Sequence, residues 1–364
     1  MFAVTGAILF IIYHLILLYI GWNGWVWLRT LWSGRRSIRY VYILVLMLLA
    51  YSFFIGRWLD GNVIITLIGA YWLALFYFSL MVLPLANLTV FLSRFTRVPR
   101  AQAEKWMGWV AIGAVAVLFA LGLFNAYIPV VRSYEITIPK KVEGKQELRI
   151  AMASDMHFGI LSGSNHAKRL VENINALKPD LVLFPGDIMD DDIEPFLGKN
   201  IPQLLQQIEA PVYASLGNHD RMHGRLLEAL ESTGMEVLYD EAVVVDDRFT
   251  LIGRKDRRDR GRLELPQLAK QADPSKPVIL LDHQPYDFDI AQQNGIDLLV
   301  AGHTHRGQIA PGFLFTGRMY ENDWGYLQKG SLHTVVSSGY GFWGTPVRMG
   351  TRSEIVQIIV KFQS

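Results

Sequence analysis

The chain has 364 residues, of which 51% are hydrophobic and 19% charged, and its formal net charge at pH 7 is +2. This near-neutral charge gives no indication of a nucleic-acid partner, so none is expected. The chain contains no cysteine, which excludes disulfides, thiolate metal ligands and thiol catalysis. Apolar residues are concentrated in the N-terminal third, which predicts a transmembrane region over residues 1–132 and a globular domain over 133–364.

Four apolar stretches in the first region are long enough, or nearly so, to cross about 30 Å of hydrocarbon as helices. They are residues 2–22, 40–56, 63–92 and 109–131. The third contains Pro84, which predicts a kink or an early end of that helix. His14 lies inside the first stretch, where we expect it to be packed or hydrogen-bonded between helices; a proton relay is the alternative.

Basic residues in the connections predict the orientation of these helices. The connection after the first stretch and the one before the fourth are rich in arginine, with Arg29, Arg35, Arg36 and Arg39 in one and Arg94, Arg97, Arg100 and Lys105 in the other. The connection between the second and third stretches has only Arg57, beside Asp60. Basic loops usually stay in the cytoplasm, so we expect a multi-pass protein of the plasma membrane whose C-terminal domain lies on the extracytoplasmic face.

From Leu148 onwards, short apolar strands alternate with helical patterns, which is typical of an α/β sheet covered on both faces. Strands are predicted at 148–153, 180–185, 211–216, 241–246, 249–253, 277–282, 297–302 and 354–362. Helices are predicted at 165–178, 196–208 and 224–233.

Five of these strands are followed by side chains of the types that commonly bind metal ions in proteins. These side chains are Asp155, His157, Asp187, Asn218, His283, His303 and His305. The carboxyl ends of strands are where α/β sheets build their sites. His303 and His305 are separated by one residue, so an extended chain would direct both imidazoles to the same side. Oxygen and imidazole ligands without sulfur suit Mn²⁺, Fe²⁺/Fe³⁺ or Zn²⁺, and so many ligands fit two divalent ions that share a carboxylate.

The segments "SDMHFG", "GDIMD", "GNHD", "DHQP" and "GHTH" resemble the five ordered blocks of the calcineurin-like metallophosphoesterase superfamily, over about residues 148–309. The segment "SSGYGFWGTPVRMGTRSEI" resembles its membrane-anchored subgroup, which includes YkuE-type phosphodiesterases and a eukaryotic transmembrane protein with a metallophosphoesterase domain. The resemblance implies a four-layer α-β-β-α sandwich of two mixed sheets.

The resemblance also implies a role for each ligand. One ion would be held by Asp155, His157, Asp187 and His305, and the other by Asp187, Asn218, His283 and His303, with Asp187 bridging. His219 would contact the phosphate, and Asp220 would orient His219 through its other ring nitrogen. Arg306 replaces the glycine that commonly follows GHTH in the subgroup, which makes it a candidate for substrate binding. Arg348 is a second candidate, either as a phosphate clamp or in a structural ion pair.

Several further residues keep two interpretations. The basic run 253–262 is either a solvated loop or a lip that meets anionic lipid or phosphate. Helix capping or solvation is expected of Asp190, Asp191 and Asp192, and support of the ligands is the alternative for Asp190. His166 and His223 are expected at the surface, and a structural role is favoured for His333.

Together these features predict a membrane-tethered, metal-dependent phosphoric ester hydrolase. Because it is tethered at the lipid bilayer, its expected substrate is a phosphodiester or phosphomonoester of the envelope, such as a phosphorylated lipid or a lipid-linked compound. If the domain were cytoplasmic, hydrolysis of the pyrophosphate of UDP-2,3-diacylglucosamine would be the alternative. A metal-dependent membrane receptor or scaffold is the alternative from another class of protein.

Overall fold

The computed structural model describes residues 2–32, 36–58, 62–220 and 223–363. The chain divides into two compact units, which we call the helical unit (residues 1–123 and 344–346) and the globular unit (residues 124–343 and 347–364). Arg35 and Asp60, and the side chains of Arg57 and His223, lie outside the described residues. The expectations for these four residues therefore stay predictions. Each unit is described by itself below.

The helical unit consists of four long helices and a 3₁₀ turn. The elements are α1 (Phe2–Leu31), α2 (Arg36–Trp58), α3 (Val63–Leu92), η1 (Ser93–Phe95) and α4 (Arg100–Tyr127), whose last residues belong to the globular unit. Each of the four helices is long and apolar enough to cross a membrane. The predicted end of the fourth span at residue 131 is wrong, because α4 ends at Tyr127 and Val130 begins a strand that pairs with Glu354.

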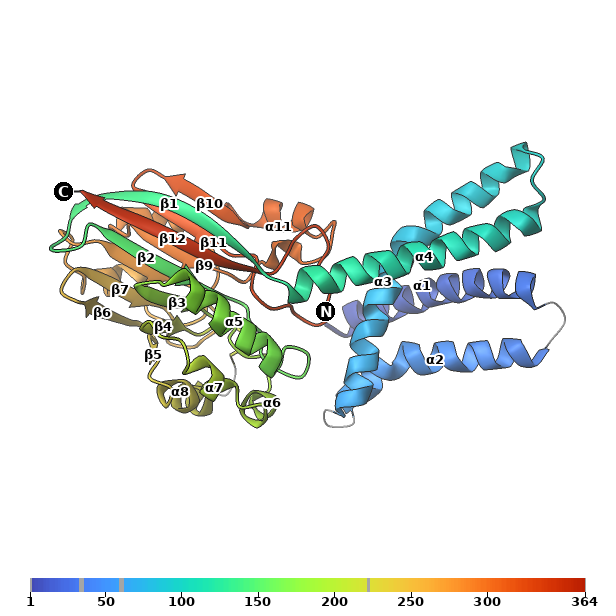
Figure 1. Ribbon diagram of the computed structural model, residues 1–364, viewed down its shortest axis with the longest axis horizontal. Coiled ribbons are helices and arrows are strands. Elements are labelled where there is room, and N and C mark those ends of the chain that lie inside the picture. Colours follow the sequence, from blue (N-terminus) through green and yellow to red (C-terminus); the bar gives the residue numbers. More distant parts are fainter. Residues whose placement is uncertain (1, 33–35, 59–61, 221–222, 364) are drawn as a thin grey trace. The chain divides into compact units, whose positions relative to one another are not determined.

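Two predictions within the helical unit have clear outcomes. Helix α3 continues through Pro84, and Figure 1 shows it changing direction along its length, as expected of a helix with an interior proline. Nε2 of His14 lies 2.7 Å from the hydroxyl of Tyr51 on α2, and its Nδ1 lies 2.8 Å from the carbonyl oxygen of Phe10. The prediction that His14 is hydrogen-bonded between helices is confirmed.

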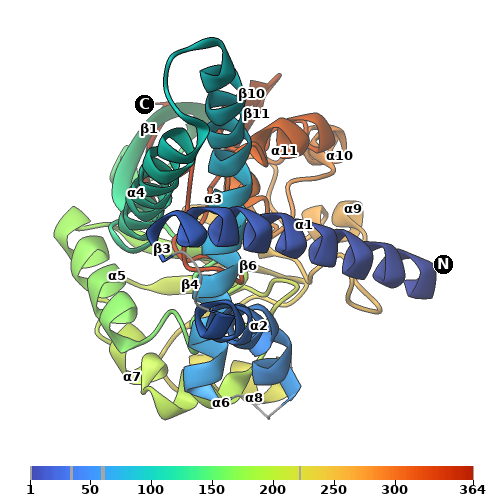
Figure 2. The ribbon, with the colours of Figure 1, turned by 90° about the vertical axis from the view of Figure 1, so that its right-hand side faces the viewer.

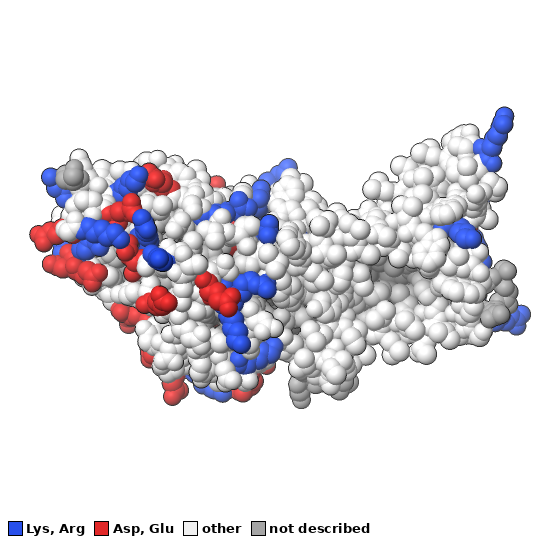
Figure 3. Space-filling view, in the orientation of Figure 1, with Lys and Arg blue, Asp and Glu red and all other residues white. Residues whose placement is uncertain are grey.

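Charged side chains mark one end of the helical unit. The C-terminus of α1 and the N-terminus of α2 lie at this end of the unit, together with the C-terminus of α3 and the N-terminus of α4 (Figure 1). On the face shown in Figure 3, the remainder of this unit is largely free of lysine, arginine and acidic side chains. We call this charged end the basic end.

The globular unit contains two six-stranded sheets. In order across the first sheet, the strands are β1 (Val130–Lys141), β12 (Glu354–Gln363), β2 (Glu147–Met152), β3 (Leu181–Pro185), β4 (Val212–Ser215) and β5 (Glu236–Val237). Across the second they are β10 (Gly325–Lys329), β11 (Leu332–Val336), β9 (Leu298–Ala301), β8 (Val278–Leu281), β7 (Phe249–Gly253) and β6 (Glu241–Val245). Each sheet combines parallel and antiparallel pairs, so both are mixed as predicted.

Helices cover the outer faces of the two sheets. On the first sheet lie α5 (Ser164–Leu177), α6 (Ile193–Gly198), α7 (Ile201–Leu205) and α8 (His223–Glu231), and on the second lie α9 (Leu265–Ala269) and α10 (Phe288–Gln293). Figure 2 shows these two groups of helices on opposite sides of the strands; α11 (Phe313–Met319) lies near α10. The single helix predicted at 196–208 is instead the pair α6 and α7, because Asn200 between them has a left-handed backbone. The predicted four-layer α-β-β-α architecture is confirmed.

The central core lies between the two sheets and fixes where their strands end. It contains Ile150 and Leu183 from the first sheet and Ile279 and Val300 from the second, all fully buried. Strands β2, β3 and β4 are parallel neighbours, as are β8 and β9. Because parallel strands end at the same edge of a sheet, the side chains that follow these five strands can converge.

Candidate metal centre

The backbone beyond the strand ends is unusual at most of the predicted ligands. Asp155, His157, Asp187, His303 and His305 all have positive φ angles, between 44° and 70°. Residues other than glycine rarely adopt this left-handed conformation, and where they do so together they usually mark a functional site. Here the conformation turns the chain sharply after β2, β3 and β9 and directs the side chains toward one another.

His303 and His305 do not share one direction, contrary to the expectation for an extended chain. Strand β9 ends at Ala301, and His305 begins the 3₁₀ turn η2 (His305–Gly307). The two imidazoles therefore join different groups of side chains.

The first group consists of Asp155, His157 and His305, and its ligand atoms all lie within 4.8 Å of one another. Nε2 of His157 lies 3.0 Å from Nε2 of His305, which in turn lies 3.4 Å from Oδ1 of Asp155. All three residues are buried. Two imidazole nitrogens and a carboxylate oxygen that face one point in this way are suitable ligands for a divalent cation.

The second group consists of Asp187, His283 and His303, again with ligand atoms within 4.8 Å of one another. Oδ2 of Asp187 lies 3.1 Å from Nε2 of His283 in this group and 3.8 Å from Nε2 of His157 in the first group. The Asp187 carboxylate therefore joins the two groups, which is the geometry that a bridging ligand requires.

Burial and charge set the protonation of these groups. Burial lowers the pKa of His157 to about 3 and that of His303 to about 4, so both rings are neutral at pH 7 and keep a lone pair for a metal. Burial raises the pKa of Asp155 to about 6. Burial also opposes protonation of His283, but the nearby Asp187 carboxylate outweighs this and raises the pKa of His283 to about 10. The raised pKa means that His283 carries a proton on the side of Asp187, and a cation bound to His283 would replace this proton.

Two observations show that these residues fit a metal. Oδ1 of Asn218 is buried and has no hydrogen-bond partner among the described residues, although such buried polar atoms are usually satisfied, and buried Nε2 of His283 has the Asp187 carboxylate as its neighbour at 3.1 Å. Two glycines also leave room for the ligands. A Cβ atom on Gly302 would lie 2.1 Å from Oδ2 of Asp155, and one on Gly186, whose φ is +85°, would lie 2.6 Å from Nδ1 of His283.

His219 lies beside the first group, but its partner differs from the predicted one. Its Nδ1 lies 3.1 Å from Oδ1 of Asp191, whereas the buried carboxylate of Asp220 accepts hydrogen bonds from the backbone amides of Ile188, Met189 and Gly217. The prediction that Asp220 orients His219 is therefore wrong. Sequence reasoning assigned Asp191 to capping or solvation, and only its position in the acidic run next to Asp187 could have singled it out.

Arg348 is fully buried, and its guanidinium serves the protein rather than a ligand. It donates hydrogen bonds to the carbonyl oxygens of Ser338 and Gly341 and to the hydroxyl of Thr351, and Nη2 lies 3.2 Å from Nδ1 of His305. The prediction of a phosphate clamp is wrong, because these contacts occupy the donors. Arg348 instead supports His305 and the loop after β11.

The guanidinium of Arg306 lies 3.8 Å from the centre of the Trp324 ring, so the indole fixes its position. Arg132 stacks on the same ring at 4.7 Å. A role for Arg306 in substrate binding stays a prediction.

The basic run contains buried ion pairs and is not simply a solvated loop. Arg254 and Arg262 both bind Asp282, the residue before His283, at 3.0 and 2.6 Å. The run therefore supports the strand end that presents His283. Asp192 caps α6 as expected, and Oδ1 of Asp190 lies 3.7 Å from Nδ1 of His157, in a supporting position.

The two remaining described histidines have different outcomes. The surface position predicted for His166 is wrong, because its side chain is packed against Tyr340 and only 4% of the residue is exposed. His333 is buried in β11, with Nδ1 2.9 Å from the hydroxyl of Tyr326, so the structural role is confirmed.

Residues 148–307 match the family described as "Calcineurin-like phosphoesterase". An uncharacterized metallophosphoesterase of Aquifex aeolicus is 30% identical over 261 residues, which cover 68% of this chain and 98% of that protein. The zebrafish (Danio rerio) "Transmembrane protein with metallophosphoesterase domain" is 31% identical over 272 residues, 69% of this chain and 62% of that protein. For the uncharacterized metallophosphoesterase YkuE of Bacillus subtilis, the identity is 27% over 283 residues, 73% of this chain and 98% of that protein.

The chain therefore belongs to the calcineurin-like phosphoesterase family, and the predicted resemblance is confirmed. It spans about 60% of the length of several of the curated relatives that it matches.

Proposed function

We propose that the protein is a metal-dependent phosphoesterase that hydrolyses phosphodiester or phosphomonoester bonds at a centre for two divalent ions. The observation that carries the proposal is the position of Asp187, whose Oδ2 faces His157 of the first group and His283 of the second. Asn218, with an unpartnered buried oxygen, would complete the second set of ligands. The ligands suit Mn²⁺, Fe²⁺/Fe³⁺ or Zn²⁺.

When bound, two such ions withdraw charge from a phosphoryl group and lower the pKa of a water molecule to the range of a usable nucleophile. The protein positions the ligands rigidly, because each follows a buried strand and several are held by backbone contacts. Both carboxylate oxygens of Asp155, for example, accept a hydrogen bond from the amide of His303, at 2.9 and 3.0 Å. The chain after β9 thereby fixes the Asp155 carboxylate after β2, so the ligands need not be rearranged during the reaction.

His219 would protonate the leaving oxygen of the phosphate ester. Because the Asp191 carboxylate only accepts hydrogen bonds, Nδ1 of His219 carries a proton when the two are bonded. A second proton, on Nε2, makes the ring an imidazolium that can donate to the leaving group, and Asp191 stabilises this charge.

The proposed substrate is a phosphorylated lipid or lipid-linked compound on the extracytoplasmic face of the plasma membrane. The four apolar helices support a membrane location, and the arginines at the basic end support a cytoplasmic position for that end. Helix α4 begins at the basic end and leads directly into β1, so a membrane-spanning α4 would carry the globular unit to the opposite face.

Turnover of bis-p-nitrophenyl phosphate and p-nitrophenyl phosphate by the purified full chain tests the activity. We expect His219→Ala to lower kcat by about 100- to 10,000-fold while the metal content stays unchanged. Removal of metal with a chelator should abolish turnover, and Mn²⁺ should restore it. If neither His219→Ala nor Asp187→Asn lowers turnover, the protein is not this enzyme, and the receptor or scaffold alternative takes its place.

A reporter fused to the C-terminus tests the orientation. Periplasmic-type alkaline phosphatase should be active there, and green fluorescent protein should remain dark when exported through the general secretory route. The opposite result would place the domain in the cytoplasm and favour hydrolysis of UDP-2,3-diacylglucosamine, which a direct assay with that substrate would then decide.

A further inference from the structure

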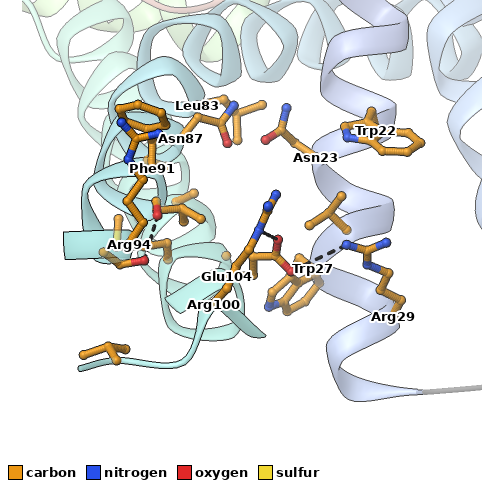
Figure 4. Close-up of a pocket in the computed structure, with 18 of the residues that line it drawn as sticks. Trp22, Asn23, Trp27, Arg29, Leu83, Asn87, Phe91, Arg94, Arg100 and Glu104 are labelled. Carbon is orange, nitrogen blue, oxygen red and sulfur yellow. Dashed lines mark hydrogen bonds and ion pairs between the residues drawn. The ribbon is translucent and has the colours of Figure 1, made fainter. Parts of the chain in front are cut away.

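A second candidate binding site lies in the helical unit, and the phosphoesterase centre has no part in it. Residues of α1, of α3 with the turn that follows it, and of α4 enclose a pocket of about 640 Å³, shown in Figure 4. We call it the basic-end pocket, because Arg29, Arg94 and Arg100 line it. This volume is in the range of pockets that hold small organic ligands.

The pocket contains more positive than negative charge. Among the residues that line it, Glu104 is the acidic one, and its carboxylate lies 2.9 Å from Nε of Arg100 and 3.6 Å from Nη2 of Arg29. Arg29 and Arg100 therefore share one carboxylate, and Arg94, the third arginine that lines the pocket, has no acidic partner among the described residues. An anionic ligand would balance this charge.

Arg94 is held in a position that leaves its donors available. Its guanidinium lies 3.7 Å from the centre of the Phe91 ring and 4.6 Å from that of Phe95. A guanidinium stacked on an aromatic face keeps its N–H groups at the edge, where they match the geometry of a phosphate. The stacking also reduces the conformational entropy that would be lost on binding.

Polar side chains continue from this charged region into the apolar part of the pocket. Asn23 and Asn87 are directed toward one another from α1 and α3 (Figure 4). Nδ2 of Asn87 donates a hydrogen bond to the hydroxyl of Tyr19, and Nε1 of Trp27 is buried without a partner among the described residues. Polar groups inside a membrane-spanning region are costly, so such a cluster indicates a binding function.

The outer wall of the pocket is apolar and exposed. Trp22 is 65% exposed and Phe91 50%, and Leu83 lies beyond them on α3. The pocket therefore combines an anion-binding end with an apolar wall. A lipid can cover this wall with a hydrocarbon chain, whereas free phosphate cannot.

We propose that the basic-end pocket binds an anionic phospholipid, with the lipid phosphate between Arg94 and Arg100 and an acyl chain along Trp22 and Phe91. The asparagines and the Trp27 indole would hydrogen-bond the ester and glycerol oxygens. This lipid is a ligand of the helical unit and is separate from any substrate of the metal centre.

Native mass spectrometry of the full chain in non-ionic detergent tests this proposal. Dioleoyl phosphatidylglycerol should be retained at lower concentration than dioleoyl phosphatidylcholine, whose acyl chains are identical. Arg94→Gln should weaken retention of phosphatidylglycerol about fivefold, as expected for one arginine–phosphate contact. Arg97→Gln is the matched control, because Arg97 is an exposed arginine of the same connection that does not line the pocket, and it should leave retention unchanged.

Three outcomes would overturn the proposal. They are equal retention of the two lipids, equal weakening by Arg94→Gln and Arg97→Gln, and displacement of the lipid by millimolar inorganic phosphate, which would identify a site for free phosphate. Arg100→Gln provides a second probe if Arg94→Gln does not fold, and it should weaken retention in the same direction. Turnover by the metal centre should be unaffected by both substitutions.

Discussion

His219 and Asp220 are neighbours in the sequence, but their side chains have different tasks. The imidazole of His219 is half-buried and paired with Asp191, whereas the carboxylate of Asp220 is fully buried among three backbone amides. Asp220 thereby holds the chain after β3 against the chain after β4. The residue proposed to support catalysis, Asp191, and the residue that holds the chain, Asp220, can therefore be separated by substitution.

We predict that Asp191→Asn lowers kcat about 10- to 100-fold, because the amide cannot stabilise an imidazolium as a carboxylate does, and that the melting temperature changes little. Asp220→Asn should destabilise the globular unit by about 1–3 kcal/mol, because the new amide N–H groups face backbone N–H groups. Steady-state kinetics and thermal unfolding of both variants measure these effects. A larger loss of kcat at comparable stability in Asp220→Asn than in Asp191→Asn would restore the original assignment of Asp220.

The elements of the globular unit position the candidate metal ligands by ending at defined residues. Beyond β2, β3 and β9 the ligands adopt left-handed backbone conformations, and glycines keep the adjacent chain close to them. Gly302, directly after β9, illustrates the constraint, since its Cβ would occupy the space of the Asp155 carboxylate.

We expect Gly302→Ala to weaken metal binding at least tenfold. The added Cβ would lie 2.1 Å from Oδ2 of Asp155 and 2.4 Å from Oγ of Ser154, so it would displace the Asp155 carboxylate. Gly198→Ala is the matched control, because a Cβ there meets no atom within 4 Å. Competition with a chromogenic chelator measures the affinity of each variant. Equal affinities in the two variants would show that the close approach at β9 is not required.

Helix α5 introduces a pH dependence of stability through His166 in its first turn. Burial lowers the pKa of His166 to about 3, against an ordinary value of 6.5. As the pH falls below about 6.5, the unfolded chain takes up a proton that the folded protein does not, so stability declines down to about pH 3, by up to about 1.4 kcal/mol per pH unit.

Replacement of this imidazole should therefore reduce the acid sensitivity. We predict a smaller loss of melting temperature between pH 7.5 and pH 5 in His166→Gln than in the wild type, even if the variant is less stable at neutral pH. An unchanged dependence on pH would show that His166 is protonated in the folded protein.

At the scale of the whole molecule, the sequence predicted the division into two units and the strand ends at which the candidate metal-binding groups lie. The concentration of apolar residues in the N-terminal third can be read directly from the sequence. The alternation of short strands and helices shows which candidate ligands follow the ends of strands. The five ligand-bearing strand ends are therefore recognisable without a structure.

The partners of these residues could not be predicted in the same way. The contact of Asp191 with His219 and the burial of Arg348 beneath His305 depend on how loops from distant strands meet. The left-handed angles at His303 and Asp187 likewise arise from tertiary packing, which overrides the local preference of those residues. The basic-end pocket also needed the structure, because its residues come from helices far apart in the sequence.

The metal content of the purified full chain tests the central claim most directly. Inductively coupled plasma mass spectrometry should find about two divalent ions per wild-type chain. Asp187→Asn should retain one or none and lose turnover of bis-p-nitrophenyl phosphate, whereas Asp247→Asn, at an exposed aspartate between β6 and β7, should change neither. A wild-type chain that binds no metal, or an Asp187→Asn variant that keeps two ions and full turnover, would contradict a centre bridged by Asp187.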